Sequence, residues 1–293
     1  MQNIPTHYVE QFTNTFTMLL QQTDTRVCQY AMQGSHRGEG AAPVDQIGLI
    51  EMAAVTSRLQ PSVPSDLPTE RRWVYPNDFA RAVYVDTFDK LRLLTDPTSF
   101  YMQALVNAAK RKMDDVFIAA LFADAKTGKT GSSTTSFPAG QQVGVNVGGT
   151  SSGLNFAKLR AAREILAANE VDPDEELFVA VTANEMSDLM NEPQLTNRDF
   201  VQFSGMSPSE SGRLMKSQGF TIIETQRLAV NGSSQRRVPV WSRLGMHFGT
   251  WEGMKASMVI DPTITGNPYK CEVTLTCGAT RVEEKRVVEI LCA

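Results

Sequence analysis

The spacing of apolar residues predicts one long helix over Asp96–Asp124. From Met102 to Leu121 the apolar side chains fall on one arc, and polar side chains lie opposite through the first four turns. Asp96 suits the N-cap, and Pro97 suits the first helical position. The stretch Val116–Ala123 has no polar residue. We therefore expect this end of the helix to be covered on all sides and to be its most buried part.

Residues 45–88 are predicted to form a long hairpin. Two extended segments, 46–57 and 71–85, are joined by LQPSVPSDLP, whose Pro61, Pro64 and Pro68 exclude both a helix and a central strand. An isolated two-stranded ribbon is only marginally stable in water. The hairpin is therefore expected to lie on another surface, in this chain or in the next one.

The remaining pattern is mixed, and the fold class is α+β without βαβ alternation. Residues 4–22 have the spacing of a weak helix, 31–48 read as an extended or flexible arm, and 127–153 and 192–213 read as loops. Further elements are a short strand near 143–147, a helix over Leu154–Asn169 ended by a left-handed Asn169, a strand over 176–181, and a helix to 191 that starts with a capping box at Thr182–Glu185. Strands are expected at 220–225, 237–241, 271–276 and 286–291, with a turn at Asn231-Gly232.

Composition excludes several classes of protein. A chain of 293 residues has room for one large or two modest domains. Its net charge of −4 and pI near 5.5 argue against a protein that grips nucleic acid backbones. There is no apolar run long enough to span a membrane, and no basic, apolar N-terminal signal. The four cysteines lack the spacing of metal ligands and fit small apolar thiols in a reducing cytoplasm.

No set of residues forms a convincing catalytic, cofactor or metal site. Gly128-Lys129-Thr130 matches the end of a phosphate-binding P-loop, but Ala123 stands where that motif needs glycine. The three histidines are far apart in sequence, and Gly205-Met-Ser207-Pro-Ser209 lacks the final glycine of a nucleophile elbow. We expect no enzyme and no cofactor. The alternative is a nucleotide-binding enzyme that uses the 127–153 loop.

Two charged groups are candidate contact sites between subunits. On the long helix, Lys110 with Asp114 and Arg111 with Asp115 have the i,i+4 spacing of ion pairs. They are expected to form a solvated face, and the alternative is a contact strip for a neighbouring subunit. Arg71-Arg72-Trp73 lies on the returning arm of the hairpin. It is expected to be an interface anchor, because Trp and Arg often dominate interface energies, and the alternative is a solvated strand edge.

The order of these segments resembles the major capsid proteins of tailed bacteriophages, which have the Hong Kong 97 fold. The resemblance rests on DTFDKLRLLTDPTSFYMQALVNAAKRKMDDVFIAALFADAKTG, on GLNFAKLRAAREILAANEVD and on the terminal CGATRVEEKRVVEILC, and it spans roughly residues 26–293. It implies an N-terminal arm (1–44), an extended loop (45–88), a peripheral domain with a long spine helix (89–172 and 251–293) and an axial domain (173–250).

The resemblance also implies a function. Many copies would form pentamers and hexamers and close into an icosahedral shell around double-stranded DNA, in a virion assembled in the bacterial cytoplasm. The extended loop has no lysine, so a lysine–asparagine cross-link known in some members is not expected. A separate scaffolding protein and a portal are the expected partners. The alternative is another phage structural protein, of the tail or the connector.

Overall fold

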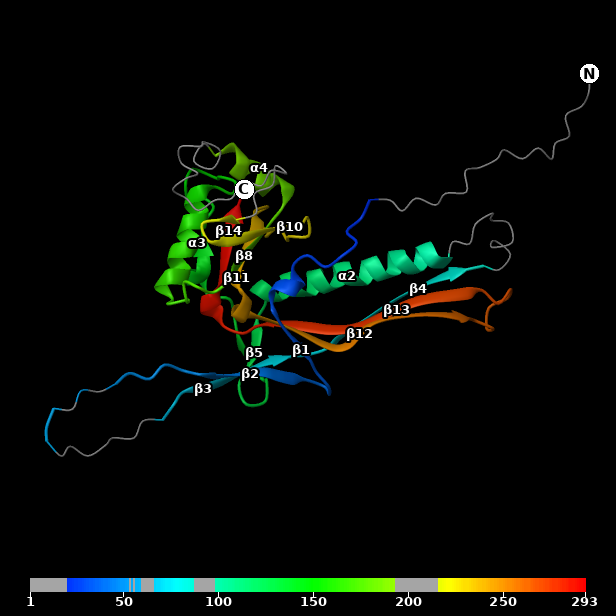
Figure 1. Cartoon of the computed structure of the whole chain (residues 1–293), viewed down its shortest axis with the longest axis horizontal. Coiled ribbons are helices and arrows are strands. Elements are labelled where there is room, and N and C mark those ends of the chain that lie inside the picture. The colour runs from blue at the N-terminus through cyan, green and yellow to red at the C-terminus, as the bar shows by residue number, and fades with distance from the viewer. Residues whose placement is uncertain (1–19, 53, 55, 59–65, 87–97, 193–215) are drawn as a thin grey trace, which may run out of the picture. The chain divides into compact units, whose positions relative to one another are not determined.

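The structure is a computed structural model, and it describes residues 20–52, 54, 56–58, 66–86, 98–192 and 216–293 (Figure 1). Some predictions lie outside these residues: most of the weak N-terminal helix, the helix start at Asp96-Pro97, the hairpin tip at 59–65 and most of the 192–213 loop. Within the described ranges, no helix is long and apolar enough to cross a membrane.

The chain divides into two compact units. One comprises 1–24, 78–111 and 254–275, and the other comprises 25–77, 112–253 and 276–293. The first unit contains β4 (Asn77–Val85) almost entirely, the first half of α2 (Thr98–Phe122), the end of β12 (Met246–Ile260) and the start of β13 (Tyr269–Arg281). These strands belong to a sheet of order β1-β12-β13-β4, where β1 is Met32–Ser35.

The core of the first unit lies between α2 and its strands. Leu105 of α2 packs with Val85 of β4 and with Cys271 and Val273 of β13. The apolar arc of the helix therefore packs against β4 and against a strand near the end of the chain. The polar side chains on the opposite side of α2 do not belong to this core.

The second unit is built on a six-stranded sheet of order β7-β14-β11-β8-β10-β9. All five residues of β8 are buried, as expected for a strand inside a sheet covered on both faces. Around it the indole of Trp241 contacts the rings of Phe117 and Phe178, at centroid distances of 5.6 and 5.9 Å. The strands and helices of this layer are β7 (Gln142–Val143), α3 (Phe156–Ala168), β8 (Leu177–Val181), α4 (Ala183–Asn191), β9 (Lys216–Ser217), β10 (Phe220–Glu224), β11 (Arg236–Ser242) and β14 (Val287–Cys292). The described residues also form the 3-10 turns η1 (Cys28–Tyr30), η2 (Ala139–Gln141), η3 (Arg243–Gly245) and η4 (Glu284–Arg286).

A second sheet in the same unit forms the base of the hairpin arm. Its order is β2-β3-β5-β6, with β2 at Ala41–Ile47, β3 at Thr69–Val74, β5 at Ala125–Thr127 and β6 at Ser133–Thr135. Strand β13 passes so close to this base that a Cβ on Gly278 would lie 2.2 Å from the carbonyl oxygen of Tyr75. Only glycine fits there, which explains one residue of the terminal motif.

The hairpin differs from its predicted form. The segment predicted as one strand, 71–85, is two strands in two different sheets, β3 and β4, and Pro76 lies between them without an N–H to bond. The first arm is paired only to Ile47, and its strand starts earlier than predicted, at Ala41. The residues here called the arm, 48–68, are described only in part, and none of those described is in a strand.

The long helix is confirmed over Thr98–Phe122, but the covering of its far end was predicted wrongly. Phe117, Ile118 and Leu121 are buried, whereas Ala119 is exposed. Described parts of the chain therefore cover one face of this end. The burial forecast also missed Asp114, which is as buried as any apolar residue of the helix.

Strand β12 is the largest element that the prediction missed. It carries Gly249 and Gly253, which weaken a strand signal, and its residues 252–260 are all exposed, so no buried apolar face marks it. Two short strands were also missed: β5 ends at the first residue of the predicted 127–153 loop, and β6 lies inside that loop. The strand predicted near 143–147 ends at Val143.

The capped helices were predicted well. The Asn155 side chain accepts a bond from the Lys158 N–H at the start of α3, and Thr182 and Glu185 form the predicted capping box of α4. The left-handed residue after α3 is Glu170 (φ 60°), not Asn169 (φ −85°). The Asn231 turn is confirmed by the bond from its N–H to the Gln235 carbonyl, 2.8 Å.

Candidate assembly surface

Asp114, one of the four residues of the charged strip on α2, is bound by the chain's own backbone. Its carboxylate accepts bonds from the N–H groups of Arg26, Val27 and Cys28, at 2.9, 3.1 and 3.2 Å. It is fully buried. Asp114 therefore attaches residues 26–28, which lead into η1, to α2. Because its side chain is buried within the chain, it contacts neither solvent nor a neighbouring subunit, which corrects both predicted alternatives at this residue.

The other three residues of the strip also have contacts within the chain. Lys110 Nζ lies 3.1 Å from Asp24, and Arg111 donates to the Gln21 side chain at 2.7 Å. Asp115 forms a two-bond ion pair with Arg227. These pairs are about one-third exposed on the helix side, so each contributes at most about 1 kcal/mol. The contact-strip hypothesis stays a prediction for these three residues.

At the other candidate, Arg71-Arg72-Trp73, two of the three side chains point into the chain. Arg72 is 3% exposed and binds Glu284 at 2.7 Å. Trp73 donates to the Gly128 carbonyl at 2.7 Å and stacks on Tyr75. Arg71 forms a two-bond pair with Asp45 across the strands, and its side chain is 43% exposed. The intersubunit role of these residues also stays a prediction, and Arg71 keeps the most surface for it.

The arm itself exposes apolar side chains that the sequence analysis did not single out. At its base and along its described part, the exposed large residues are Ile47, Leu49, Ile50, Met52 and Leu67. Met52 is 98% exposed and Leu49 is 80% exposed. A group of apolar residues so close in sequence and so open to solvent is typical of a surface that another protein covers.

A second exposed apolar group lies in the other compact unit. The pairing of β12 with β1 ends at Thr250, and beyond it Met254, Met258, Val259 and Ile260 are exposed. A shallow pocket of about 310 Å³ opens beside Val259 and Ile260.

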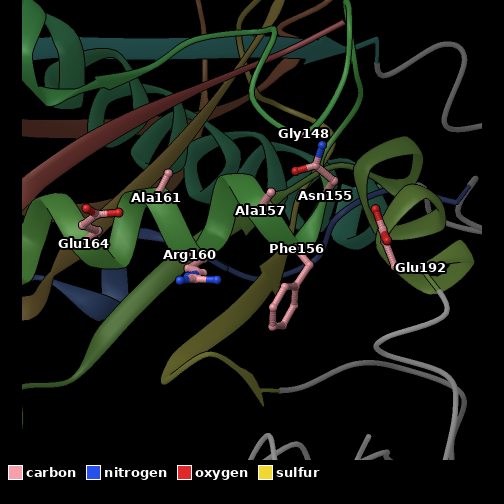
Figure 2. A pocket seen from close by; sticks show the side chains of 8 residues that line it. All are labelled: Gly148, Asn155, Phe156, Ala157, Arg160, Ala161, Glu164 and Glu192. Carbon is pink, nitrogen blue, oxygen red and sulfur yellow. The ribbon is translucent and has the colours of Figure 1, made fainter.

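A larger pocket, of about 480 Å³, opens at the start of α3 (Figure 2). Its walls mix apolar and charged groups: Gly148, Asn155, Phe156, Ala157, Arg160, Ala161, Glu164 and Glu192. The amide of Asn155 already donates to the Val147 carbonyl, and its oxygen caps the helix. The lining residues include no pairing of a nucleophile with a base, so the pocket suggests no reaction.

The P-loop-like fragment does not form a phosphate site. Gly128, with φ 86°, and Gly131, with φ 72°, lie in the turn between β5 and β6. No helix follows this turn, so the helix N-terminus that holds a phosphate in a true P-loop is missing here. A Cβ on Gly131 would lie 2.2 Å from Tyr75 Oη, so the turn is shaped to cover Trp73 and Tyr75. Among the described residues, no three His, Cys, Asp or Glu side chains group as metal ligands.

Comparison with solved structures shows the fold. The chain is similar to the capsid protein of cyanophage Pam1, with a TM-score of 0.76, 12% identity and coverage of 99% and 98% of the two chains. For the capsid of cyanophage P-SCSP1u the TM-score is 0.72, with 14% identity and coverage of 97% and 93%. For the head of Helicobacter pylori bacteriophage KHP40 it is 0.68, with 10% identity and coverage of 99% of each chain. The predicted Hong Kong 97-type α+β capsid fold is confirmed.

Comparison of sequences gives the family. No curated protein matches the chain significantly. The family described as phage capsid protein matches residues 4–293, nearly the whole chain. With that match and the shared fold, the chain belongs to the phage capsid protein family.

Proposed function

We propose that this protein is the major capsid subunit of a tailed phage, which assembles into pentamers and hexamers and closes into an icosahedral head shell. The family and the fold support this proposal. The single observation that carries it is the arm, because its described part lies outside every strand while Leu49 and Met52 are almost fully exposed. An apolar arm of this kind becomes stable when it lies on a neighbouring copy.

The exposed apolar group on β12 supports the same function. Two separate apolar surfaces on one chain allow each copy to contact more than one neighbour, as a closed shell requires. Each interface needs only an ordinary size and a modest energy, because the same contacts repeat around the shell. The residues proposed to contact neighbours are Arg71, Lys110, Arg111 and Asp115 together with these two groups.

The subunit's role is proposed to be structural, with no catalytic step. Its mild net negative charge suits a shell that encloses double-stranded DNA without binding it tightly. A separate scaffolding protein and a portal are proposed as assembly partners, and the virion is the proposed location. The four proposed regions are the N-terminal arm at 1–44, the extended loop at 45–88, which contains the arm at 48–68, the peripheral domain at 89–172 and 251–293, and the axial domain at 173–250.

Negative-stain electron microscopy of the expressed protein tests the proposal. The protein would be produced alone and together with the genes that flank it in its genome. Capsomers, closed shells or polymorphic shell fragments are the expected result. Rings or tubes of fixed diameter would instead support a connector or tail protein, and a monomer under both conditions would contradict the proposal.

A further inference from the structure

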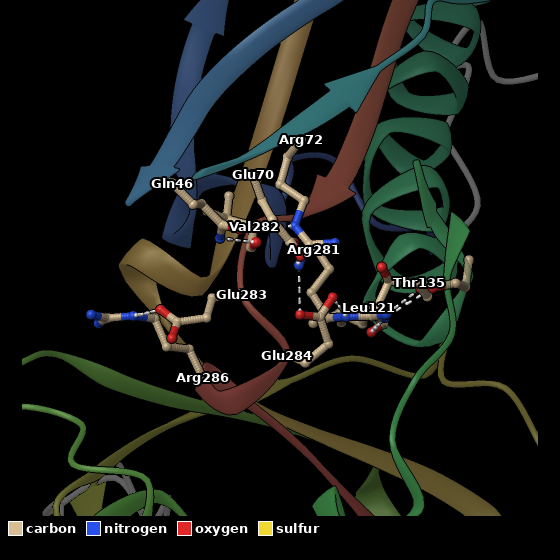
Figure 3. A network of polar contacts seen from close by, with 11 residues as sticks. Gln46, Glu70, Arg72, Leu121, Thr135, Arg281, Val282, Glu283, Glu284 and Arg286 are labelled. Carbon is tan, nitrogen blue, oxygen red and sulfur yellow. Dashed lines mark hydrogen bonds and ion pairs between the residues drawn. The ribbon is translucent and has the colours of Figure 1, made fainter. Parts of the chain in front are cut away.

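The base of the arm is tied to the rest of its unit by a buried group of charges (Figure 3). The group consists of Arg72 on β3, Glu284 in the turn η4 and Arg281 at the end of β13. Arg72 Nη2 donates to Glu284 Oε2 at 2.7 Å, and Arg281 Nε lies 3.5 Å from Glu284 Oε1. Arg281 is fully buried, and the side chain of Glu284 is 14% exposed. One carboxylate thus joins two buried guanidinium groups.

Arg281 extends this connection to the end of the long helix. Its Nη1 donates to the carbonyls of Leu121 and Ala123, each at 2.9 Å, and its Nη2 donates to the Thr135 carbonyl at 3.2 Å. The last carbonyls of a helix lack partners within the helix, and a buried cation satisfies them and opposes the negative end of the helix dipole. The guanidinium group therefore holds α2, β6 and β13 at fixed positions relative to one another.

Both strands at the base of the arm take part. Gln46, on β2, donates to the Val282 carbonyl at 2.5 Å and accepts from Arg72 Nε at 3.2 Å. The C-terminal turn thus contacts β2 through Gln46 and β3 through Arg72. Movement of the arm's base against α2 would break bonds to groups that are buried from water.

In this group two guanidinium groups share the carboxylate of Glu284. The carboxylate of Glu70 lies 3.6 Å from Arg72, but its side chain is 63% exposed, which weakens its effect, and Asp124 adds a negative charge near Arg281. Among the described residues, Arg72 Nη1 and Arg281 Nε have no hydrogen-bond partner. Burial also lowers the pKa of Arg281 from its ordinary value. A buried group of this kind adds little net stability compared with apolar side chains, but it strongly favours one geometry over others.

We propose that the Arg72–Glu284–Arg281 group, here called the arm latch, fixes the direction in which the arm leaves its unit, and that shell assembly depends on this direction. The inference rests on the proposed role of the arm in contacting a neighbouring copy. Glu284 is the positioning residue at its centre. Preorganisation of the arm reduces the ordering that each subunit must undergo when it joins the shell.

Glu284→Gln tests the latch, and the neighbouring Glu283→Gln is its matched control. Glu283 pairs with Arg286 at 2.7 Å in the same turn, is 40% exposed and does not contact Arg72 in the described network. Because Glu284→Gln leaves two cations buried without their carboxylate, it can unfold the protein. The double variant Arg72→Met with Glu284→Gln removes one cation as well, so it breaks the latch with a smaller penalty.

The first measurement is the distance distribution between two spin labels on the unassembled full-length subunit. The labels are attached at Ser57→Cys on the arm and at Ala167→Cys on α3, which are exposed sites. The four native cysteines are buried and do not compete for the label while the protein stays folded, which circular dichroism checks for each variant. We expect the double variant to widen the distribution at least twofold, while Glu283→Gln leaves it unchanged. A folded double variant with the wild-type width would overturn the proposal.

The second measurement is the yield of closed shells by electron microscopy. We expect the double variant to lose at least fivefold in closed shells relative to Glu283→Gln, with open or irregular fragments in their place. A wild-type yield from the folded double variant would also overturn the proposal. If the wild-type protein itself forms no shells, the proposed function fails, but the label distances still decide whether the latch holds the arm.

Discussion

At the scale of single residues, two histidines that are far apart in sequence face each other where β1 meets β12. His36 Nε2 and His247 Nε2 lie 2.8 Å apart, so one ring donates a hydrogen bond to the other. His247 is 5% exposed, and the indole of Trp251 contacts the His36 ring at 5.2 Å. Burial and the nearby His36 lower the pKa of His247 to about 4, and burial also lowers the pKa of His36.

These histidines predict that the subunit loses stability in mild acid. The unfolded chain takes up a proton on each histidine as the pH falls below about 6.5, whereas folded His247 stays neutral down to about pH 4. Stability is therefore fully present above pH 6.5 and falls between pH 6.5 and 4, by up to about 1.4 kcal/mol per pH unit for a histidine that stays neutral. His247→Gln should reduce this slope in urea unfolding of unassembled subunits. A slope equal to that of the wild type would contradict the assignment.

The sequence did not show which charged residues are buried. The charged strip that contains Asp114 reads as a solvated helix face, and periodicity marks neither Lys158 nor Arg281 as buried, because it carries no information on which other segment covers a position. The structure shows all three fully buried. Lys158 donates to the carbonyls of Ser152 and Leu291, at 2.6 and 2.8 Å, and these partners are distant in sequence or in a loop. Only tertiary contacts could reveal them.

At the scale of elements, the attachment of η1 to α2 gives a prediction with a built-in control. Asp114→Asn replaces one acceptor oxygen by an N–H group that faces backbone donors, so we expect a loss of about 1–3 kcal/mol in the free energy of unfolding. Asp115→Asn is the same change one residue later and removes only the partly exposed pair with Arg227, which is worth about 0–1 kcal/mol. Urea unfolding of both variants measures the difference. Equal losses would show that Asp114 does not hold the 26–28 backbone.

Elements with a local signal were predictable, and elements stabilised by distant partners were not. The helices α3 and α4 have side-chain caps within three residues, so their starts could be read from the sequence. Strand β12 has no local signal, because its glycines and its exposed end hide the pattern that its neighbours β1 and β13 impose. Among the candidate contact residues, Arg72 was recognised as important, but its partner Glu284 lies 212 residues away and could not be paired with it.

At the scale of the whole molecule, the exposed apolar arm should matter for assembly and little for the folding of one copy. Leu49 and Met52 are 80% and 98% exposed, so Leu49→Asp with Met52→Asp should shift the melting temperature of the free subunit by no more than a few degrees. In a shell, these positions are proposed to be buried against a neighbour. An unpaired charge in an apolar contact costs several kcal/mol, so we expect closed shells to fall at least tenfold.

The double variant Thr56→Asp with Ser57→Asp controls for added charge. It places the same two charges on the same arm, at exposed positions that carry no large apolar side chain. Because only the loss of apolar surface should prevent docking, we expect this control to assemble at least several times better than the Leu49 and Met52 variant, under identical conditions in the electron microscope. If both variants lost shells equally, charge on the arm would be the cause, and the apolar side chains would not be the contact that joins one copy to the next.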